Sequence, residues 1–311
     1  MRSLILAAFA AALFFALPAQ AQEAVQLHFD PPEGQAVRYK YERVIDDPRA
    51  PRSLSSTFSL RFQRLKEGFR VAVTPETSSF DIPGLSSEMA KRMDAVARMP
   101  YALRLSDEGA IVEIEEGDAF WQQLVSMTEE MLSTPGGATP SEEEKAQLQS
   151  YVALWRDAPP EVKLNMLTEG LQPIFEYAAS EWVEGERVEF KFETPTPFGA
   201  VTRHGASWLE GVDGDTAIIK YEGSVPREEL DRLMQRLMGV TGGKRAEEAM
   251  KELEKAIRGF ERRDEGIYRV TKGDGLLERA QVSATTKVSA DDEQMVRTDT
   301  IKLERLFDRA E

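Results

Sequence analysis

The amino-acid sequence predicts an α+β protein with two similar, curved, antiparallel β-sheet lobes, each covered by helices and joined by a helical bridge. Three observations predict this class. Residues 33–42 align without gaps on residues 184–193, long segments alternate apolar and polar residues as strands do, and other segments carry apolar residues at helical spacing. The lobes are expected at residues 22–116 and 182–311, and the helical bridge at residues 117–181.

The chain begins with the features of a secretory signal peptide. Arg2 precedes an apolar run over residues 4–17, and a small-x-small sequence ends at Ala21. The run is shorter than the roughly 20 apolar residues that a transmembrane helix requires. We therefore expect a signal peptide at residues 1–21, cleavage near Ala21, and a protein located in the periplasm or secreted. No membrane-spanning segment is expected after removal of the signal.

The amino-acid composition of the chain excludes several kinds of partner and chemical site. The formal net charge is −15 over 311 residues, and the chain contains no cysteine. A strongly acidic chain repels nucleic-acid phosphates, so we expect no nucleic-acid partner. The absence of cysteine excludes disulfides, thiolate metal sites and a cysteine nucleophile.

The two aligned segments open the two predicted lobes. In each segment a valine and two aromatic residues occupy alternate positions, which places them on one face of a strand. These residues are Val37, Tyr39 and Tyr41 in the first copy, and Val188, Phe190 and Phe192 in the second.

The regions downstream of the two segments are also alike. Each copy continues with two more alternating segments, a helical stretch and a hairpin that turns at an Asp/Gly sequence, at 107–109 and at 273–275. The shared order indicates an internal duplication. Two further long strands are expected at 278–288 and 295–306, joined by the acidic turn 290–293.

Helical spacing marks the remaining elements. Apolar residues recur every three or four positions after Asp118, which is a plausible N-cap, and again over residues 148–155 and 162–177. These helices form the predicted bridge. In the second lobe, apolar stripes over residues 230–238 and 246–260 predict two helices separated by Gly242 and Gly243.

No motif carries recognisable catalytic chemistry. The only histidines, His28 and His204, have no partner at the spacing of a zinc site, and Ser207 lacks a Gly-x-Ser-x-Gly surround. His204 is interpreted as a solvent-facing residue of a strand. The acidic clusters at 213–215 and 291–293 are interpreted as hairpin turns rather than calcium loops. We therefore predict no catalytic residue, no cofactor and no metal ligand.

Methionines are the one unusual feature of the predicted helices. Thioether side chains are flexible and polarizable, and they suit surfaces that accept varied apolar ligands. The same stripes also suit ordinary packing of helices on a sheet, so both interpretations stay open. If the helices line an apolar cleft, the residues expected to line it are Met89, Met93, Leu230, Met234 and Met238.

Two resemblances arise from these patterns. The opening strand, with Gly34, Val37, Tyr39 and Tyr41, resembles the Gly-x-x-Val-x-Tyr-x-Tyr strand of exported bacterial proteins of unknown function. The sheet–helix–hairpin order is also similar in topology to the half-barrel of the lipoprotein-localisation factor. That second resemblance implies a carrier of apolar ligands in the periplasm.

The function expected from the sequence is non-enzymatic. We predict an exported periplasmic protein that binds an apolar small molecule or lipid, or an envelope protein. One alternative is a hydrolase of envelope polymers that works through paired carboxylates, which would stand about 5 to 9.5 Å apart. Another is a structural envelope component that presents free strand edges to a partner.

Overall fold

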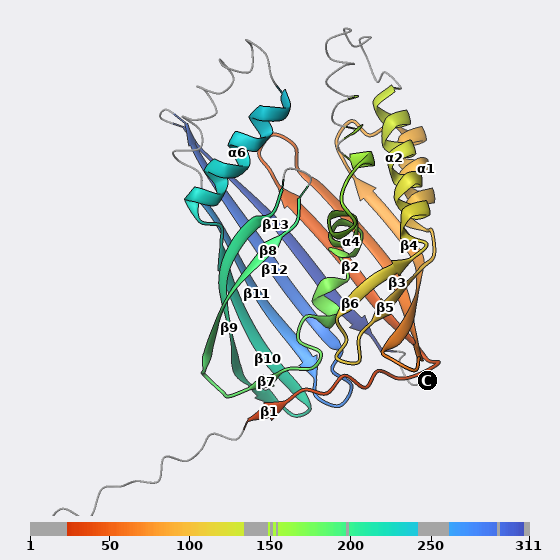
Figure 1. Cartoon of the computed structure of the whole chain (residues 1–311), viewed down its shortest axis with the longest axis vertical. Helices are drawn as coiled ribbons and strands as arrows, with labels where there is room; N and C mark the ends of the chain where they lie inside the picture. Colours follow the sequence, from red (N-terminus) through yellow and green to blue (C-terminus); the bar gives the residue numbers. More distant parts are fainter. Residues whose placement is uncertain are drawn as a thin grey trace, which may run out of the picture.

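The computed structural model contains one large antiparallel sheet and a small two-stranded one. It describes residues 24–133, 149, 152–153, 155–196, 199–241, 261–290 and 293–307. The large sheet has 11 strands in the order β6-β5-β4-β3-β2-β13-β12-β11-β10-β9-β8. It curves around a concave face that Figure 1 shows towards the viewer.

The first part of the chain forms one side of this sheet. Its strands alternate buried and exposed residues, as the sequence predicts, because one face is turned towards the core. They are β2 (Ala36–Asp46), β3 (Arg52–Arg64), β4 (Phe69–Asp81), β5 (Tyr101–Leu105) and β6 (Ile111–Glu115).

The last part of the chain forms the other side. Its strands are β8 (Arg187–Thr194), β9 (Val201–Asp213), β10 (Thr216–Ser224), β11 (Glu261–Thr271), β12 (Leu277–Ala290) and β13 (Glu293–Leu306). The short strands β1 (Val25–Gln26) and β7 (Glu181–Trp182) pair with each other outside the large sheet.

The expectation of two separate sheets is wrong. Strand β13 pairs with β12 on one side and with β2 on the other, so both halves belong to one sheet. Leu303 lies opposite Ala280 and also opposite Tyr41, and all three are buried. A strand with free backbone groups on both edges can pair twice, and here the final strand does so.

Within this sheet the two halves repeat one order. Strands β2 to β4, helix α1 (Ser87–Ala97) and strands β5 and β6 correspond to strands β8 to β10, helix α6 (Arg227–Thr241) and strands β11 and β12. The turns before β2 and β8 also match. Gly34 and Gly185 have φ values of 70° and 75°, and their N–H groups donate to the carbonyls of Phe62 and Leu209 respectively, both at 2.9 Å.

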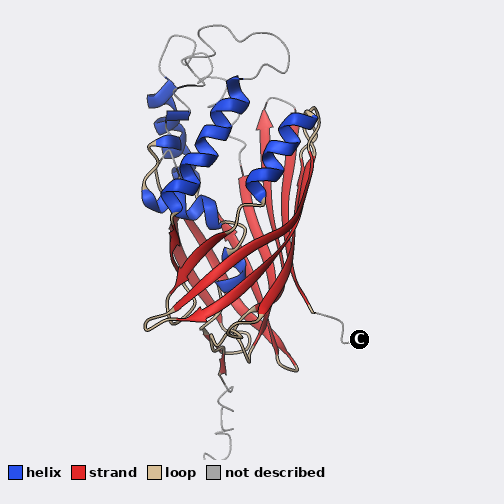
Figure 2. Ribbon diagram, turned by 90° about the vertical axis from the view of Figure 1, so that its right-hand side faces the viewer, coloured by secondary structure: helices blue, strands red, loops and turns tan. Residues whose placement is uncertain are grey.

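The longer helices gather at one end of the sheet (Figure 2). Helix α1 contacts β4 and helix α2 (Gly117–Ser133), whereas α6 contacts β9 near the opposite edge. In α1, the Ser86 side chain accepts a hydrogen bond from the Met89 N–H, which caps the helix. Helices α4 (Pro160–Thr168) and α5 (Gln172–Phe175) lie in the segment expected to bridge the halves.

The main core fills the end of the concave face away from α1 and α6. Short helix α5 packs here, and Ile174, Leu27 and Leu303 are at most 1% exposed. The hydroxyl of buried Tyr39 donates to the Leu277 carbonyl at 2.8 Å. Aromatic rings meet edge to face, with Phe29 at 5.1 Å from Phe69 between ring centroids.

A second, smaller core lies among the helices. Trp121 of α2 stacks on Trp155 at 5.8 Å between ring centroids and donates its indole N–H to the Trp155 carbonyl at 2.8 Å. Val125 and Val162 are buried in the same cluster. The helices therefore have a core of their own beside the sheet.

Five sequence expectations lie partly or wholly outside the described residues: the signal peptide at 1–21, the stripe over 148–155, the break at 242–243, the stripe over 246–260 and the turn at 290–293. No helix in the described part of the chain is long and apolar enough to cross a membrane.

Candidate functional site

The concave face of the sheet changes from packed apolar residues to charged residues towards the helices. The last fully packed row across the sheet contains Leu303, Ala280 and Tyr268, each at most 3% exposed. Each of the next three rows towards the helices consists of residues that pair across neighbouring strands, and their side chains point to the same concave face. Together with Arg203, which extends the third row, we call them the upper inner face.

From β13 to β11 the rows of the upper inner face become more polar towards the helices, whereas on β2 Arg43 lies opposite Ile301 and Ile45 lies opposite Asp299. The first contains Ile301, Val282, Gly266 and Tyr221, the second Asp299, Ala284, Asp264, Gly223 and Gly205, and the third Arg297, Thr286 and Arg262. Ile301, Val282 and Ala284 stay half-buried. On these three strands the surface therefore passes from an apolar row through an acidic row to a cationic one.

Arg43 anchors one side of this face. Its Nε and Nη2 atoms donate to the two carboxylate oxygens of Asp299 at 3.0 and 2.7 Å, a bidentate pair. Glu169, from the segment between α4 and α5, lies 3.5 Å from Arg43 Nη1. The hydrogen bond with Asp299 raises the pKa of Arg43 despite its partial burial.

A second charged cluster contains two arginines and one carboxylate. Asp264 is 4% exposed, and its Oδ1 atom accepts from Arg262 Nε at 3.0 Å. Its Oδ2 atom accepts from Arg203 Nη1 at 3.2 Å. Arg203 Nε is buried and has no hydrogen-bond partner among the described residues.

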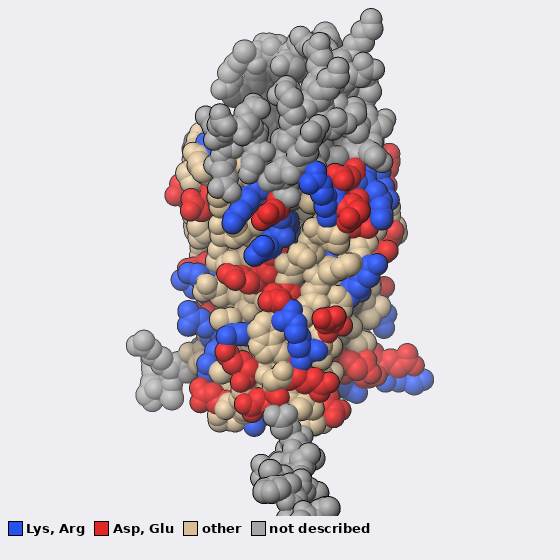
Figure 3. Space-filling model, turned by 90° about the vertical axis from the view of Figure 1, so that its left-hand side faces the viewer, with Lys and Arg blue, Asp and Glu red and all other residues tan. Residues whose placement is uncertain are grey.

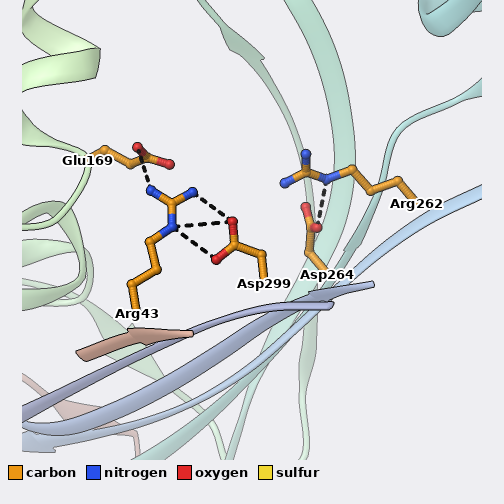
Figure 4. Close-up of polar contacts among 5 residues, drawn as sticks. All are labelled: Arg43, Glu169, Arg262, Asp264 and Asp299. Carbon is orange, nitrogen blue, oxygen red and sulfur yellow. Dashed lines mark hydrogen bonds and ion pairs between the residues drawn. The ribbon is translucent and has the colours of Figure 1, made fainter. Parts of the chain in front are cut away.

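The two clusters belong to one polar zone. Asp299 and Asp264 flank Ala284 on three neighbouring strands, and their side chains share the concave face. Figure 4 shows Arg43, Asp299 and Glu169 on one side and Arg262 with Asp264 on the other. The charge of Glu169 also acts on Arg203, which connects the clusters electrostatically.

Aromatic rings border the second cluster. Phe190 of edge strand β8 stacks on Tyr221 at 5.9 Å, with 9° between the ring planes. Gly205 allows this packing, because a Cβ there would lie 2.6 Å from the Phe190 ring and 2.8 Å from the Glu222 carbonyl oxygen. Burial raises the pKa of Tyr221 to about 12, so its hydroxyl keeps its proton.

Glu176 lies deeper in the concave space. Burial raises its pKa to about 6, and a hydrogen bond with Tyr268 only partly offsets this shift. The residue nevertheless keeps an exposed surface. The hydrogen bond with Tyr268, a residue of the last fully packed row, places Glu176 next to the bottom of the upper inner face.

The outer face carries a different feature. A groove of about 940 Å³ crosses β8 to β12, and most of its lining residues point away from the concave face. Its charges are mixed, with Glu189 beside Lys191 and an ion pair between Arg187 and Glu222. Figure 3 likewise shows acidic and basic side chains interspersed on the side that carries β9. This balance favours a solvated surface.

The residues predicted from the sequence to line a cleft lie on two helices. Met89 and Met93 are half-buried on α1, and Leu230 is half-buried on α6. Met234 and Met238 also belong to α6, but their side chains lie outside what the structure describes. Because α1 contacts β4 and α6 contacts β9, these helices stand at opposite sides of the sheet (Figure 1).

Sequence reasoning missed the charged residues of the upper inner face. Their signal is present, because each charged residue continues an alternating apolar series towards the strand end. Arg43 comes after Tyr39 and Tyr41, while Asp299 precedes Ile301 and Leu303. The histidines, by contrast, are exposed as expected for His204, and His28 is exposed too.

Comparison with known proteins does not assign this chain to a family. No family model matches the chain, and no curated protein matches it. A structure described as "Lipid-protein interactions in lipovitellin" is similar with 9% identity and a TM-score of 0.44, covering 89% of this chain and 25% of that one. The crystal structure of Rv2717c from M. tuberculosis is similar with 8% identity and a TM-score of 0.23, covering 87% and 91%. The chain spans about a quarter of the lipovitellin chain, and both TM-scores are too low to establish a shared fold.

Proposed function

We propose that this is an exported, non-enzymatic protein of the periplasm that binds an apolar or amphiphilic ligand on the upper inner face. The observation that carries this proposal is the gradient across that face, from packed core through half-buried Val282 and Ile301 to arginines at the end near the helices. An amphiphile has the same gradient along its length.

The helices support this proposal by their position. Helices α1 and α6 stand at one end of the sheet and flank it on two sides (Figures 1 and 2). Glu229 of α6 accepts a hydrogen bond from the N–H of Thr202, the neighbour of Arg203, so this end also carries the second charged cluster. The half-buried residues Met89, Met93 and Leu230 are then candidates to contact an apolar ligand as it enters. An apolar segment of an envelope protein would enter by the same route.

The charges favour binding over catalysis. Asp264 and Asp299 both accept hydrogen bonds from arginine, an arrangement that suits structural pairing or anion recognition. A general acid–base pair would instead need its carboxyl groups directed at a substrate bond.

Ligand binding is tested with the purified protein. Native mass spectrometry and organic extraction should reveal a co-purifying apolar species, and an uncharged fluorescent apolar probe such as Nile red should bind. Val282→Arg should lower probe affinity about tenfold, because it places a charge in the apolar row. The control Ile267→Arg lies on the outer face of β11, where Ile267 is 47% exposed, and should change nothing. Absence of any extracted species together with equal probe binding by both variants would overturn the proposal.

A further inference from the structure

The two charged clusters of the upper inner face differ in their charge balance. Arg43 has two carboxylates within reach, Asp299 at 2.7 Å and Glu169 at 3.5 Å. Arg203 and Arg262 share the single carboxylate of Asp264. The first cluster therefore has one arginine for two acids, and the second has two arginines for one acid.

Hydrogen bonding shows the same contrast. Arg43 uses both Nε and Nη2 on Asp299. Arg203 uses only Nη1 and Arg262 only Nε, so the Nη groups of Arg262 make no hydrogen bond to any described residue. An arginine has five N–H donors, and a buried one without an acceptor, such as Arg203 Nε, is costly to leave unsatisfied.

The electrostatics agree with the geometry. Burial lowers the pKa of Arg203, and the neighbouring charge of Arg262 lowers it further, with only a partial offset from Asp264, Tyr221 and Glu169. The pKa of Arg43 is raised instead. The second cluster therefore has more positive than negative charges, whereas the first cluster has more negative than positive charges.

We infer that the ligand is an anionic amphiphile, whose carboxylate or phosphate headgroup lies against the N–H groups of Arg203 and Arg262 that Asp264 does not use, while its apolar part lies along Val282 and Ile301. This inference rests on the proposed function. The side chains of Arg203 and Arg262 are 24% and 33% exposed, and the strand register places both on the concave face, so neither arginine is sealed off from a ligand there. Planar guanidinium groups bind carboxylate and phosphate oxygens through paired hydrogen bonds.

The position of the headgroup also fits the gradient. Asp264 holds both guanidinium groups in the row next to Val282, so a ligand with its charge at the arginines directs its chain towards the core. Arg297, opposite Thr286 in the same row as Arg262, adds positive potential.

The inference is tested with four probes that share a dodecyl chain: dodecanoate, dodecyl phosphate, dodecyl maltoside and dodecyltrimethylammonium. Affinities are measured by isothermal titration below the micelle concentration. The two anions should bind at least tenfold more tightly than the uncharged and cationic probes, and comparison of the anions distinguishes carboxylate from phosphate. Raising the salt concentration should weaken the anions selectively.

Variants assign the preference to the two arginines. Arg203→Met and Arg262→Met should each lower the affinity for the preferred anion about tenfold and leave dodecyl maltoside unchanged. Arg263→Met is the matched control, because Arg263 is the exposed neighbour of Arg262 on the outer face, and it should have no effect. If Arg203→Met fails to fold, Arg262→Met and the salt dependence decide.

The outcomes separate the two proposals. Equal affinities for anionic and uncharged probes, or an anion preference that survives both methionine variants, would overturn the inference and leave ligand binding intact. Failure of every probe, including the uncharged one, would overturn the proposed function itself.

Discussion

Asp264 is the residue on which the second charged cluster depends. Its side chain is 4% exposed and accepts hydrogen bonds from Arg203 at 3.2 Å and from Arg262 at 3.0 Å. Asp264→Asn preserves the shape of the side chain, removes its charge and leaves two arginines facing each other. We expect it to destabilise the protein and, at the same time, to strengthen the binding of an anionic amphiphile.

The size of the stability loss caused by Asp264→Asn depends on how deeply the ion pairs of Asp264 are buried. Removing one partner of a fully buried ion pair costs about 3–5 kcal/mol, whereas exposed pairs contribute about 0–1 kcal/mol. Here the carboxylate is buried, but the arginines retain 24% and 33% exposure and can be partly solvated. We therefore expect the free energy of unfolding to fall by about 2 kcal/mol.

Urea unfolding monitored by tryptophan fluorescence measures this change. The matched control is Asp213→Asn, because Asp213 pairs with Arg269 at 3.0 Å but is 72% exposed. The control should lose no more than about 0.5 kcal/mol. Equal stability of the wild type and Asp264→Asn would show that the cluster is solvated and would refute the reasoning from burial.

Three further predictions concern stability. Tyr39→Phe should lower the free energy of unfolding by about 1–2 kcal/mol in urea, since the Leu277 carbonyl loses its donor, and an unchanged midpoint would contradict the bond. Because the pKa of Glu176 rises to about 6 on folding, the native state binds more protons than the unfolded state between about pH 4.5 and 6. Stability should therefore decrease as the pH rises through that range, by less than about 1 kcal/mol given the exposure of the residue. Thermal midpoints across pH 4 to 8 should show this loss in the wild type but not in Glu176→Gln. Gly34→Ala and Gly185→Ala should each cost about 1 kcal/mol, because positive φ strains alanine while no atom lies within 4 Å of the added Cβ. Clearly unequal costs in chemical unfolding would argue against equivalent turns.

Strands were predicted well from the sequence because side-chain alternation is local. The segment around Tyr39 and Tyr41 buries the predicted face. Val188 and Phe192 lie on the matching strand of the second half, β8 at the edge of the sheet, but they are 46% and 39% exposed, so that part of the prediction is wrong. Strand pairing is not local. Nothing in the alternation of residues 295–306 says that they pair with β2 as well as with β12, and that double pairing joins the halves into one sheet.

The candidate site illustrates the same limit. Alternation shows that Arg43, Asp264 and Asp299 face inwards, because they continue apolar series. It does not show that Asp264 lies between two arginines, since Arg203 comes from β9, far away in the sequence. The methionine stripes predicted helices, but their role as ligand contacts stays a prediction.

Photo-crosslinking locates the ligand most directly. A dodecanoate analogue with a terminal diazirine should bind the native protein and, on illumination, label inward-facing residues such as Val282 and Ile301 in β12 and β13. Outward-facing neighbours such as Ile267 and Lys302 should stay unlabelled. Labelling confined to the outer face, with competition by unlabelled dodecanoate, would contradict the account.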